Sequence, residues 1–260
     1  MQDLSCAGQC SLTVALPVLS AYGLETCVLP TAILSNHTAF NIWSCLDLTP
    51  ETDNIISAWR KNNFKFDAFL LGYLGSSEIM KAAKVCFRDF SNESAKIIID
   101  PAFGDNGRLY PAFDNIYVNA MADLIKSANI ILPNVTEACF LTGIEYQTDT
   151  SVESARKIVK KLAEHTPATI VLTGIECDDK IGELICSEGE FSEVWAKKLP
   201  RHFHGTGDLF ASVFTAVYLQ SGNLTKACEE AGNFVASSIY ATDNTHIYGV
   251  NFEYVLNNIR

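Results

Sequence analysis

The sequence predicts a single α/β domain in which helices cover both faces of a mostly parallel central sheet. Short, almost continuously apolar segments alternate with longer amphipathic ones, as expected when strands are buried on both faces. No repeat, low-complexity segment or linker divides the 260 residues. Apolar residues make up 48% of the chain, which is enough for one large core. Residues 1–260 are therefore expected to form one domain.

The expected strands are short, and each is followed by turn or helix-capping residues. They are Thr26–Ala32, Asp67–Leu71, Lys96–Ile99, Asn129–Leu132 and Thr169–Leu172. Two later segments, Ile181–Ser187 and Phe191–Ala196, have the pattern of an antiparallel pair.

The expected helices begin at recognisable capping residues. Thr49-Pro50 places a proline in the first turn of a helix, and a second helix begins at Ser76 or Ser77. The remaining helical segments are Ser151–His165, Thr206–Ser221, Leu224–Ala241 and a short one near the C-terminus.

Charge and composition exclude several classes of function. A net charge of −11 argues against a nucleic-acid surface or a basic membrane patch. No apolar segment approaches the ~20 residues of a membrane span, and no export signal opens the chain. The nine cysteines form no C-x-x-C pair, so we expect reduced thiols in a cytoplasmic protein.

One motif carries most of the chemistry. In His204–Ala211, Gly205 and Gly207 allow a sharp turn and a close approach to a ligand at the start of a long helix. Backbone N–H groups of residues 206–208 would face a phosphate, and Asp208 could accept a proton from a hydroxyl group. The alternative is that Asp208 only caps the helix.

Gly205-Thr206-Gly207-Asp208 resembles the C-terminal signature of the ribokinase-like superfamily, in which this aspartate is the catalytic base. Further segments resemble its pyridoxal kinase branch, including the pyridoxamine kinases, in the same order along the chain. They are Asp3-Leu4-Ser5, Cys10-Ser11-Leu12-Thr13, Ser35-Asn36-His37-Thr38, Gly72-Tyr73-Leu74-Gly75, Asp100-Pro101-Ala102-Phe103-Gly104-Asp105, Asn134-Val135-Thr136-Glu137 and Thr173-Gly174. The resemblance implies a three-layer α/β/α sandwich.

The resemblance also implies an activity. The expected reaction is ATP- and Mg²⁺-dependent phosphorylation of the 5′-hydroxymethyl group of pyridoxal, pyridoxine or pyridoxamine. A monovalent cation and a homodimer are further family features. Two alternatives stay open: a hydroxymethylpyrimidine kinase of the same fold, which typically has cysteine in place of this aspartate, and a vitamin B6 binding protein without catalysis.

The resemblance assigns the nucleotide and metal residues to the ends of the strands. Asp100 and Asp105 are expected near Mg²⁺ or ATP, although both also suit a strand end and a glycine-rich turn. Asn134 and Glu137 are expected to hold the magnesium–phosphate cluster, largely through water, and they could equally form a capping box. Thr173 is expected to contact ATP.

Three departures from the family pattern affect these expectations. Leu132 replaces a threonine that is common in relatives, so a hydroxyl contact to the phosphates is expected to be lost. Gly174 replaces a serine and leaves only backbone there. Asp3 stands where many pyridoxal kinases have serine, which would alter the preference among B6 vitamers.

The expected vitamer-binding residues are Asp3, Thr38 and Tyr73. A pyridoxal ring requires an aromatic or apolar wall and a few hydrogen-bond partners. Tyr73 would supply the wall and a hydroxyl group, Thr38 a hydroxyl group and Asp3 an acceptor. Tyr73 could instead be a core aromatic residue.

Two expectations concern the backbone. Residues 101–114 contain two glycines and many polar residues, which is typical of a lid that closes over nucleotide. Only Met1 and Gln2 precede Asp3, whereas family members have a buried strand there. We therefore expect the first strand to be truncated, and upstream residues to raise stability and activity.

Overall fold

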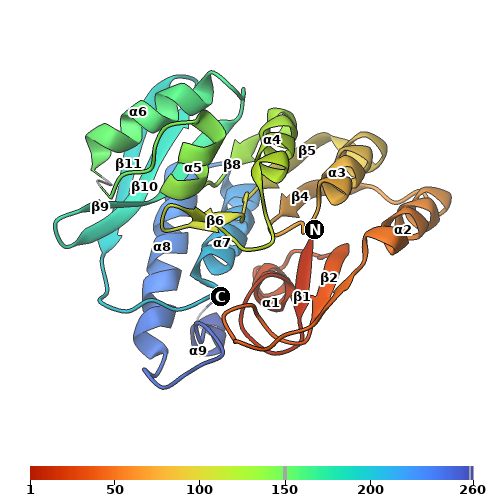
Figure 1. Ribbon diagram of the computed structural model, residues 1–260, viewed down its shortest axis with the longest axis horizontal. Helices are drawn as coiled ribbons and strands as arrows, with labels where there is room; N and C mark the ends of the chain where they lie inside the picture. The colour runs from red at the N-terminus through yellow and green to blue at the C-terminus, as the bar shows by residue number, and fades with distance from the viewer. Residues whose placement is uncertain (149–150, 258, 260) are drawn as a thin grey trace.

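Two sheets form the central layer of the computed structural model, which describes residues 1–148, 151–257 and 259, and helices pack on both faces (Figure 1). The strands are β1 (Gln2–Ser5), β2 (Pro30–Leu34), β3 (Cys45–Asp47), β4 (Phe66–Leu71), β5 (Ser91–Ile99), β6 (Gly104–Asp105), β7 (Arg108–Leu109), β8 (Ile130–Ile131), β9 (Thr169–Cys177), β10 (Lys180–Ser187) and β11 (Glu190–Lys197). The larger sheet has the order β11-β10-β9-β8-β5-β4, and the smaller has the order β1-β2-β3. From β4 to β9 all neighbours are parallel, which confirms the predicted α/β class.

The helices alternate with these strands along the chain. They are α1 (Leu12–Ala21), α2 (Thr49–Lys61), α3 (Ser77–Phe90), α4 (Asn115–Leu124), a 3₁₀ turn (Ile125–Ser127), α5 (Val135–Thr142), α6 (Val152–Ala163), α7 (Thr206–Ser221), α8 (Leu224–Ala241) and α9 (Glu253–Leu256). Within the described ranges, no helix is both long and apolar enough to cross a membrane.

The first residue joins the two sheets. The Met1 amine donates to the Leu70 carbonyl (2.6 Å), and the Gly72 N–H donates to the Met1 carbonyl (3.1 Å). These bonds place the start of β1 beside the end of β4, so the two sheets form one continuous layer. Asp3 consequently lies at the same edge as Asp100.

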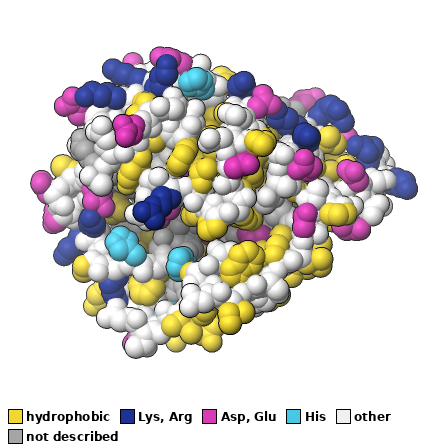
Figure 2. Space-filling model, in the orientation of Figure 1, with side chains coloured by type: hydrophobic (Ala, Val, Ile, Leu, Met, Phe, Trp, Pro, Cys, Tyr) yellow, Lys and Arg dark blue, Asp and Glu magenta, His cyan; other side chains and the backbone are white. Residues whose placement is uncertain are grey.

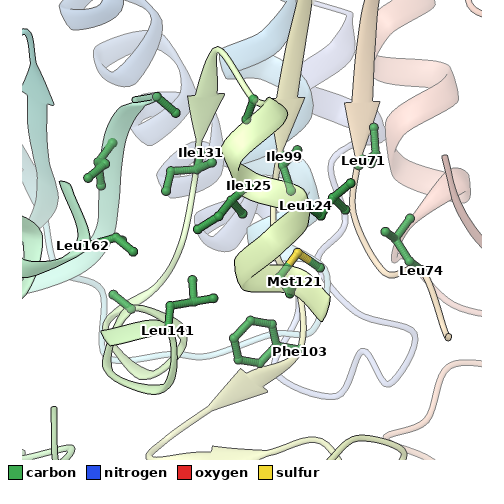
Figure 3. Packing of buried hydrophobic residues seen from close by; sticks show 14 of the residues in the cluster. Leu71, Leu74, Ile99, Phe103, Met121, Leu124, Ile125, Ile131, Leu141 and Leu162 are labelled. Atoms are coloured by element: carbon green, nitrogen blue, oxygen red, sulfur yellow. The ribbon is translucent and has the colours of Figure 1, made fainter. Parts of the chain in front are cut away.

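Two apolar cores hold the layers together, one on each face of the sheet. On one face α3–α6 pack against the strands, and Figure 3 shows Leu124 of α4 beside Ile99 and Ile125 of the 3₁₀ turn beside Ile131. On the other face α1, α7 and α8 cover the sheet. Each fully buried side chain of this size contributes about 1.5–3 kcal/mol. Because both faces are covered, polar groups gather at the strand ends.

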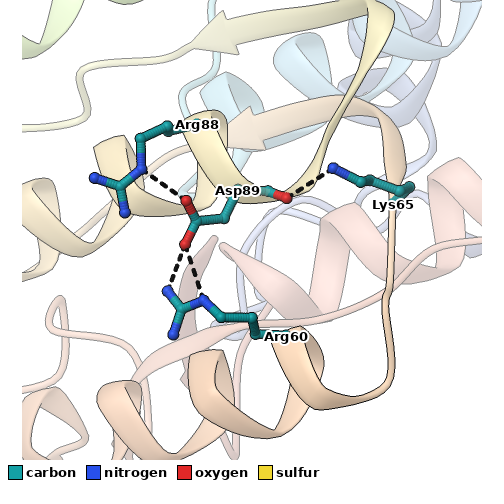
Figure 4. A network of polar contacts seen from close by, with 4 residues as sticks. All are labelled: Arg60, Lys65, Arg88 and Asp89. Carbon is teal, nitrogen blue, oxygen red and sulfur yellow. Dashed lines mark hydrogen bonds and ion pairs between the residues drawn. The ribbon is translucent and has the colours of Figure 1, made fainter.

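An ion-pair network links the edge helices (Figure 4). Asp89 of α3 accepts hydrogen bonds from Arg60 of α2 and from the neighbouring Arg88, and the Lys65 amine donates to the Asp89 carbonyl (2.9 Å). Both arginines lower the pKa of Asp89 to about 2. Both arginine side chains are exposed, so the network orients α2 against α3 more than it stabilises the fold.

Most predicted elements are confirmed, with shifted ends. The strand predicted at Thr26–Ala32 begins only at Pro30, because the preceding residues have no strand partner in the described sheet. Strands β1 and β3 and helices α1 and α4 were not predicted. Helix α1 contains Pro17 at an interior position, which obscures its pattern.

Candidate active site

A cavity of about 390 Å³ opens where β5, β8 and β9 end and α7 begins. Figure 2 shows this face of the molecule, on which histidine side chains border a hollowed area. The structure brings all of the predicted nucleotide, metal and catalytic residues into its lining. They are Asp100, Asp105, Asn134, Glu137, Thr173, Gly205, Thr206, Gly207 and Asp208.

The glycine turn at the start of α7 has the geometry expected of an anion site. Gly205 is the N-cap of α7 and has a φ of 83°. The first helical bond runs from the Leu209 N–H to the Gly205 carbonyl (2.9 Å). The N–H groups of residues 206–208 therefore have no partner within the helix, and they lie at its positive end.

Asp208 is the third residue of α7, so the interpretation that it caps the helix is wrong; Gly205 holds that position. The Asp208 carboxylate instead accepts a hydrogen bond from the Ser11 N–H at the start of α1. Loss of hydration at the cavity wall raises the pKa of Asp208 to about 7, with a smaller contribution from the Asp3 charge. A carboxylate with this pKa is suited to accept a proton near neutral pH.

Asp100 and Glu137 form an acidic pair on the opposite wall. Burial, the Glu137 charge and the Asp208 charge raise the pKa of Asp100 well above its usual value. Burial also raises the pKa of Glu137 to about 7, although three backbone N–H groups stabilise its ionised form. Three carboxyl groups held this close favour a bound cation, which would relieve their repulsion.

Asn134 and Glu137 form the capping box that the sequence allowed. Glu137 also accepts bonds from the Phe103 N–H (2.9 Å) and the Gly104 N–H (3.4 Å), while the Asn134 amide donates to the Gly104 carbonyl (2.8 Å). The pair thus anchors the start of the predicted lid to α5. Within the lid, β6 and β7 form a hairpin. Closure over nucleotide stays a prediction.

Thr173 and Gly174 lie in a β-bulge. Thr173 donates through its N–H to the Pro133 carbonyl (2.9 Å), which places it beside Asn134. Gly174 has a φ of 75°, and the register between β9 and β10 shifts at this point. The left-handed backbone at this bulge explains why a glycine, and not the serine of several relatives, occupies position 174. The Leu132 side chain is buried and has no hydroxyl group, so the contact that a threonine would make there is absent.

The chemistry of the donor set fits Mg²⁺ bound together with phosphates. Among the described residues, no three His, Cys, Asp or Glu side chains are arranged to hold a metal ion by themselves. Mg²⁺ usually takes one or two carboxylates, several waters and phosphate oxygens, so a complete protein cage is not required. Asp100 is the carboxylate best placed to contribute, because the Glu137 oxygens already accept backbone bonds.

The predicted vitamer residues divide into two groups. Asp3 is buried in β1, and its charge contributes to the raised pKa of both Asp208 and Tyr73. Burial and then Asp3 raise the pKa of Tyr73 to about 12, so this hydroxyl keeps its proton. Thr38 instead lies exposed in the turn after β2, and none of the described contacts joins it to the cavity.

The sequence did not single out His37 and His204 as substrate contacts. His37 is buried, its ring lies 5.3 Å from that of His204, and its Nε2 has no hydrogen-bond partner among the described residues. Burial and then His204 lower the pKa of His37. The available signal for His37 in the sequence was its position in the Ser35–Thr38 segment, which resembles the pyridoxal kinases.

Asp208 should make the stability of the ligand-free protein depend on pH. Its folded-state pKa is raised, so between about pH 4 and 7 the folded chain holds a proton that the unfolded chain has lost, and stability falls as pH rises. In Asp208→Asn, urea unfolding should show a gain over the parent that grows by about 1 kcal/mol per pH unit between pH 5 and 7. Comparing the two proteins cancels the titrating groups that do not interact with Asp208. A difference that is constant with pH would contradict the raised pKa.

Comparison with known proteins agrees with this geometry. The family model described as phosphomethylpyrimidine kinase matches residues 16–251. A pyridoxal kinase from Dictyostelium discoideum is 25% identical over 94% of this chain and 86% of its own. The pyridoxal kinase structure from Lactobacillus plantarum is 33% identical, covers 99% of this chain and 94% of its own, and superposes with a TM-score of 0.92.

A third relative links both names. A Bacteroides thetaiotaomicron protein provisionally named phosphomethylpyrimidine kinase, whose structure was solved in a form with pyridoxal, is 37% identical. The match covers 99% of this chain and 93% of that one, with a TM-score of 0.93. The chain belongs to the phosphomethylpyrimidine kinase family and has the ribokinase-like fold of the pyridoxal kinases.

Proposed function

We propose that this protein is an ATP- and Mg²⁺-dependent kinase that phosphorylates the 5′-hydroxymethyl group of pyridoxal, pyridoxine or pyridoxamine. The observation that carries the proposal is the Asp208 carboxylate in the first turn of α7, directly after the glycine turn and facing Asp100 across one cavity. The names of the relatives and the pyridoxal-bound structure support the substrate class.

In the proposed mechanism, Asp208 accepts the proton of the vitamer hydroxyl group as that oxygen attacks the transferred phosphoryl group. The N–H groups of residues 206–208 point toward the developing negative charge from the start of α7. Mg²⁺ would neutralise charge on the phosphates. Asn134, Asp105 and Thr173 position the nucleotide, while Tyr73 and Asp3 position the vitamer ring near Asp208. Asp100 and Glu137 would hold the cation, Glu137 through water.

Hydroxymethylpyrimidine kinase is the second candidate, because the family model and one close structure carry a phosphomethylpyrimidine kinase name. Both substrates are aromatic nitrogen heterocycles with a hydroxymethyl group, so the same catalytic residues would serve either. Asp208 itself argues for a vitamin B6 substrate, because the pyrimidine kinases typically have a cysteine there. A B6 binding protein without catalysis is the third candidate.

Coupled ADP release separates these candidates. We expect turnover of at least one B6 vitamer, with kcat/KM above that for hydroxymethylpyrimidine. A much higher kcat/KM for hydroxymethylpyrimidine would assign the protein to the second candidate. Tight pyridoxal phosphate binding without turnover of any substrate would favour the carrier.

We also propose a homodimer in the cytoplasm, where ATP is available. The segment after β2 exposes Ile42, Trp43 and Leu46, and apolar side chains gather along the lower edge of the face in Figure 2. An exposed apolar patch of this kind is typical of an interface. Light scattering that reports a monomer at micromolar concentration would contradict the dimer.

A further inference from the structure

A buried carboxyl group lies in the same cavity with no assigned role. Glu183, in the middle of β10, is only 8% exposed and lines the cavity. No hydrogen bond or ion pair to its carboxyl group occurs among the described residues. Burial raises the pKa of Glu183 to about 8, and no opposing charge offsets that effect. An unpartnered buried carboxyl group destabilises a fold, so a ligand partner is the simplest reason to keep one.

The position of Glu183 relative to the catalytic groups follows from the sheet. It lies opposite Thr173 on β9 and opposite Val194 on β11, so these three side chains share one face. Thr173 is next to Asn134 at the phosphate end of the cavity. Glu183 is therefore one strand further from the catalytic groups, in the direction of α8. The Glu183 charge also contributes to the raised pKa of Cys228 on α8, which places the two groups close together.

The wall of the cavity around Glu183 is formed mostly by small and apolar residues. Gly232, Val235 and Ala236 of α8 line it, together with Ile181 and Ala196 of the sheet. Three of these residues carry a methyl group or no side chain at all. Little projects from this wall, so a flat aromatic group can lie against it. Glu183 is then the polar group at one edge of this flat wall.

We propose that Glu183 forms hydrogen bonds with the edge of the nucleotide base and that these bonds make the kinase prefer adenine. This inference rests on the proposed function. The phosphates would lie at the start of α7, and the base would reach the wall that β10 and α8 form. The base edge of adenine offers an amine donor next to a ring-nitrogen acceptor.

The protonation state of Glu183 decides which base fits. With a pKa of about 8, Glu183 is mostly protonated at neutral pH, so it presents one O–H donor and one carbonyl acceptor. That pair complements the amine and ring nitrogen of adenine. Guanine presents two adjacent donors, which an ionised carboxylate would suit better. Charged groups also line the cavity nearby, including Lys198 and Arg201, but neither bonds to Glu183: Lys198 pairs with Glu176, and Arg201 with residues 240–244.

Two variants test the role by direct binding of diphosphates, which requires no turnover. Glu183→Gln keeps one donor and one acceptor, so calorimetry should give an ADP affinity within about threefold of the parent. Glu183→Leu removes both, and its ADP affinity should fall about tenfold or more. The same leucine variant should melt at a higher temperature without ligand, because it removes an unpartnered buried carboxyl group. Rising stability together with falling ADP affinity is not expected of a purely structural residue.

Altered nucleotides locate the contact. Purine riboside diphosphate lacks the amine, so the leucine substitution should cost it less affinity than it costs ADP. Unchanged ADP affinity in Glu183→Leu would overturn the proposal. It would also be overturned if the leucine substitution weakened binding of purine riboside diphosphate as much as that of ADP but did not weaken binding of 2′-deoxy-ADP, because Glu183 would then contact the ribose. Failure of vitamer turnover, with ADP still bound and sensitive to Glu183, would overturn the proposed function and leave this inference standing.

Discussion

Asp208→Asn should lower kcat by about 10² to 10⁴ while the KM for ATP and for the vitamer change little. Asparagine keeps the size of the side chain and can still accept the hydrogen bond from the Ser11 N–H, but it cannot take the proton of the attacking hydroxyl group. The fold should survive, because a neutral group removes the cost of burying a charge beside Asp3 and Asp100. Steady-state kinetics with urea unfolding on the same samples measures both effects.

Asp243→Asn is the matched control, because Asp243 is exposed and does not line the cavity. Its carboxylate accepts bonds from the Thr245 N–H (2.8 Å) and the Thr245 hydroxyl group (2.6 Å), which the side-chain oxygen of asparagine can also accept. Its kcat should stay within about twofold of the parent. A folded Asp208→Asn protein with kcat within a few-fold of the parent would rule out the general-base assignment.

The same residue sets the expected pH profile. The pH dependence of kcat/KM reports the pKa values of the free enzyme, and the ionised form of Asp208 is the base. We therefore expect kcat/KM to fall about tenfold per pH unit below about pH 7. A plateau that extends down to pH 5 would show that another group accepts the proton.

The sequence predicted the catalytic turn well because its signals are local. The start of α7 at Thr206 and the capping box at Asn134 depend on residues within one turn of each other, and both are confirmed. The exposed position of Thr38 was not predictable in this way. Its place depends on the path of the chain after β2, which no neighbouring residue specifies.

Glu183 was missed for a related reason. In the sequence it is one charged residue in a strand, Ile181–Ser187, whose other members are mostly apolar, and an edge strand could carry it exposed. Its burial depends on the packing of α8 over β10 and on the register shift at Gly174, which sets Glu183 opposite Thr173. Long-range packing of this kind has no local signature.

Gly205→Ala should both destabilise the protein and nearly abolish activity. A Cβ atom at Gly205 would lie 1.9 Å from the Gln9 carbonyl oxygen, and the φ of 83° is unfavourable for alanine. The Gln9 backbone cannot retreat easily, because it is bonded to Tyr248 and bridges Gly249. Strain and overlap together should cost about 3 kcal/mol or more in unfolding free energy. Displacing the turn by about 1 Å should also reduce kcat about 10²-fold.

Gly207→Ala separates the catalytic role of the turn from its structural role. A Cβ atom there meets no protein atom within 4 Å and the backbone is helical, so stability should be unchanged or rise by up to about 1 kcal/mol. The new methyl group would nevertheless occupy space at the cavity wall where the phosphates approach the start of α7. We expect kcat/KM for ATP to fall at least about 10²-fold in a protein that unfolds at the same or a higher urea concentration. Full activity in Gly207→Ala would place the phosphates elsewhere in the cavity and remove the α7 N-terminus from the mechanism.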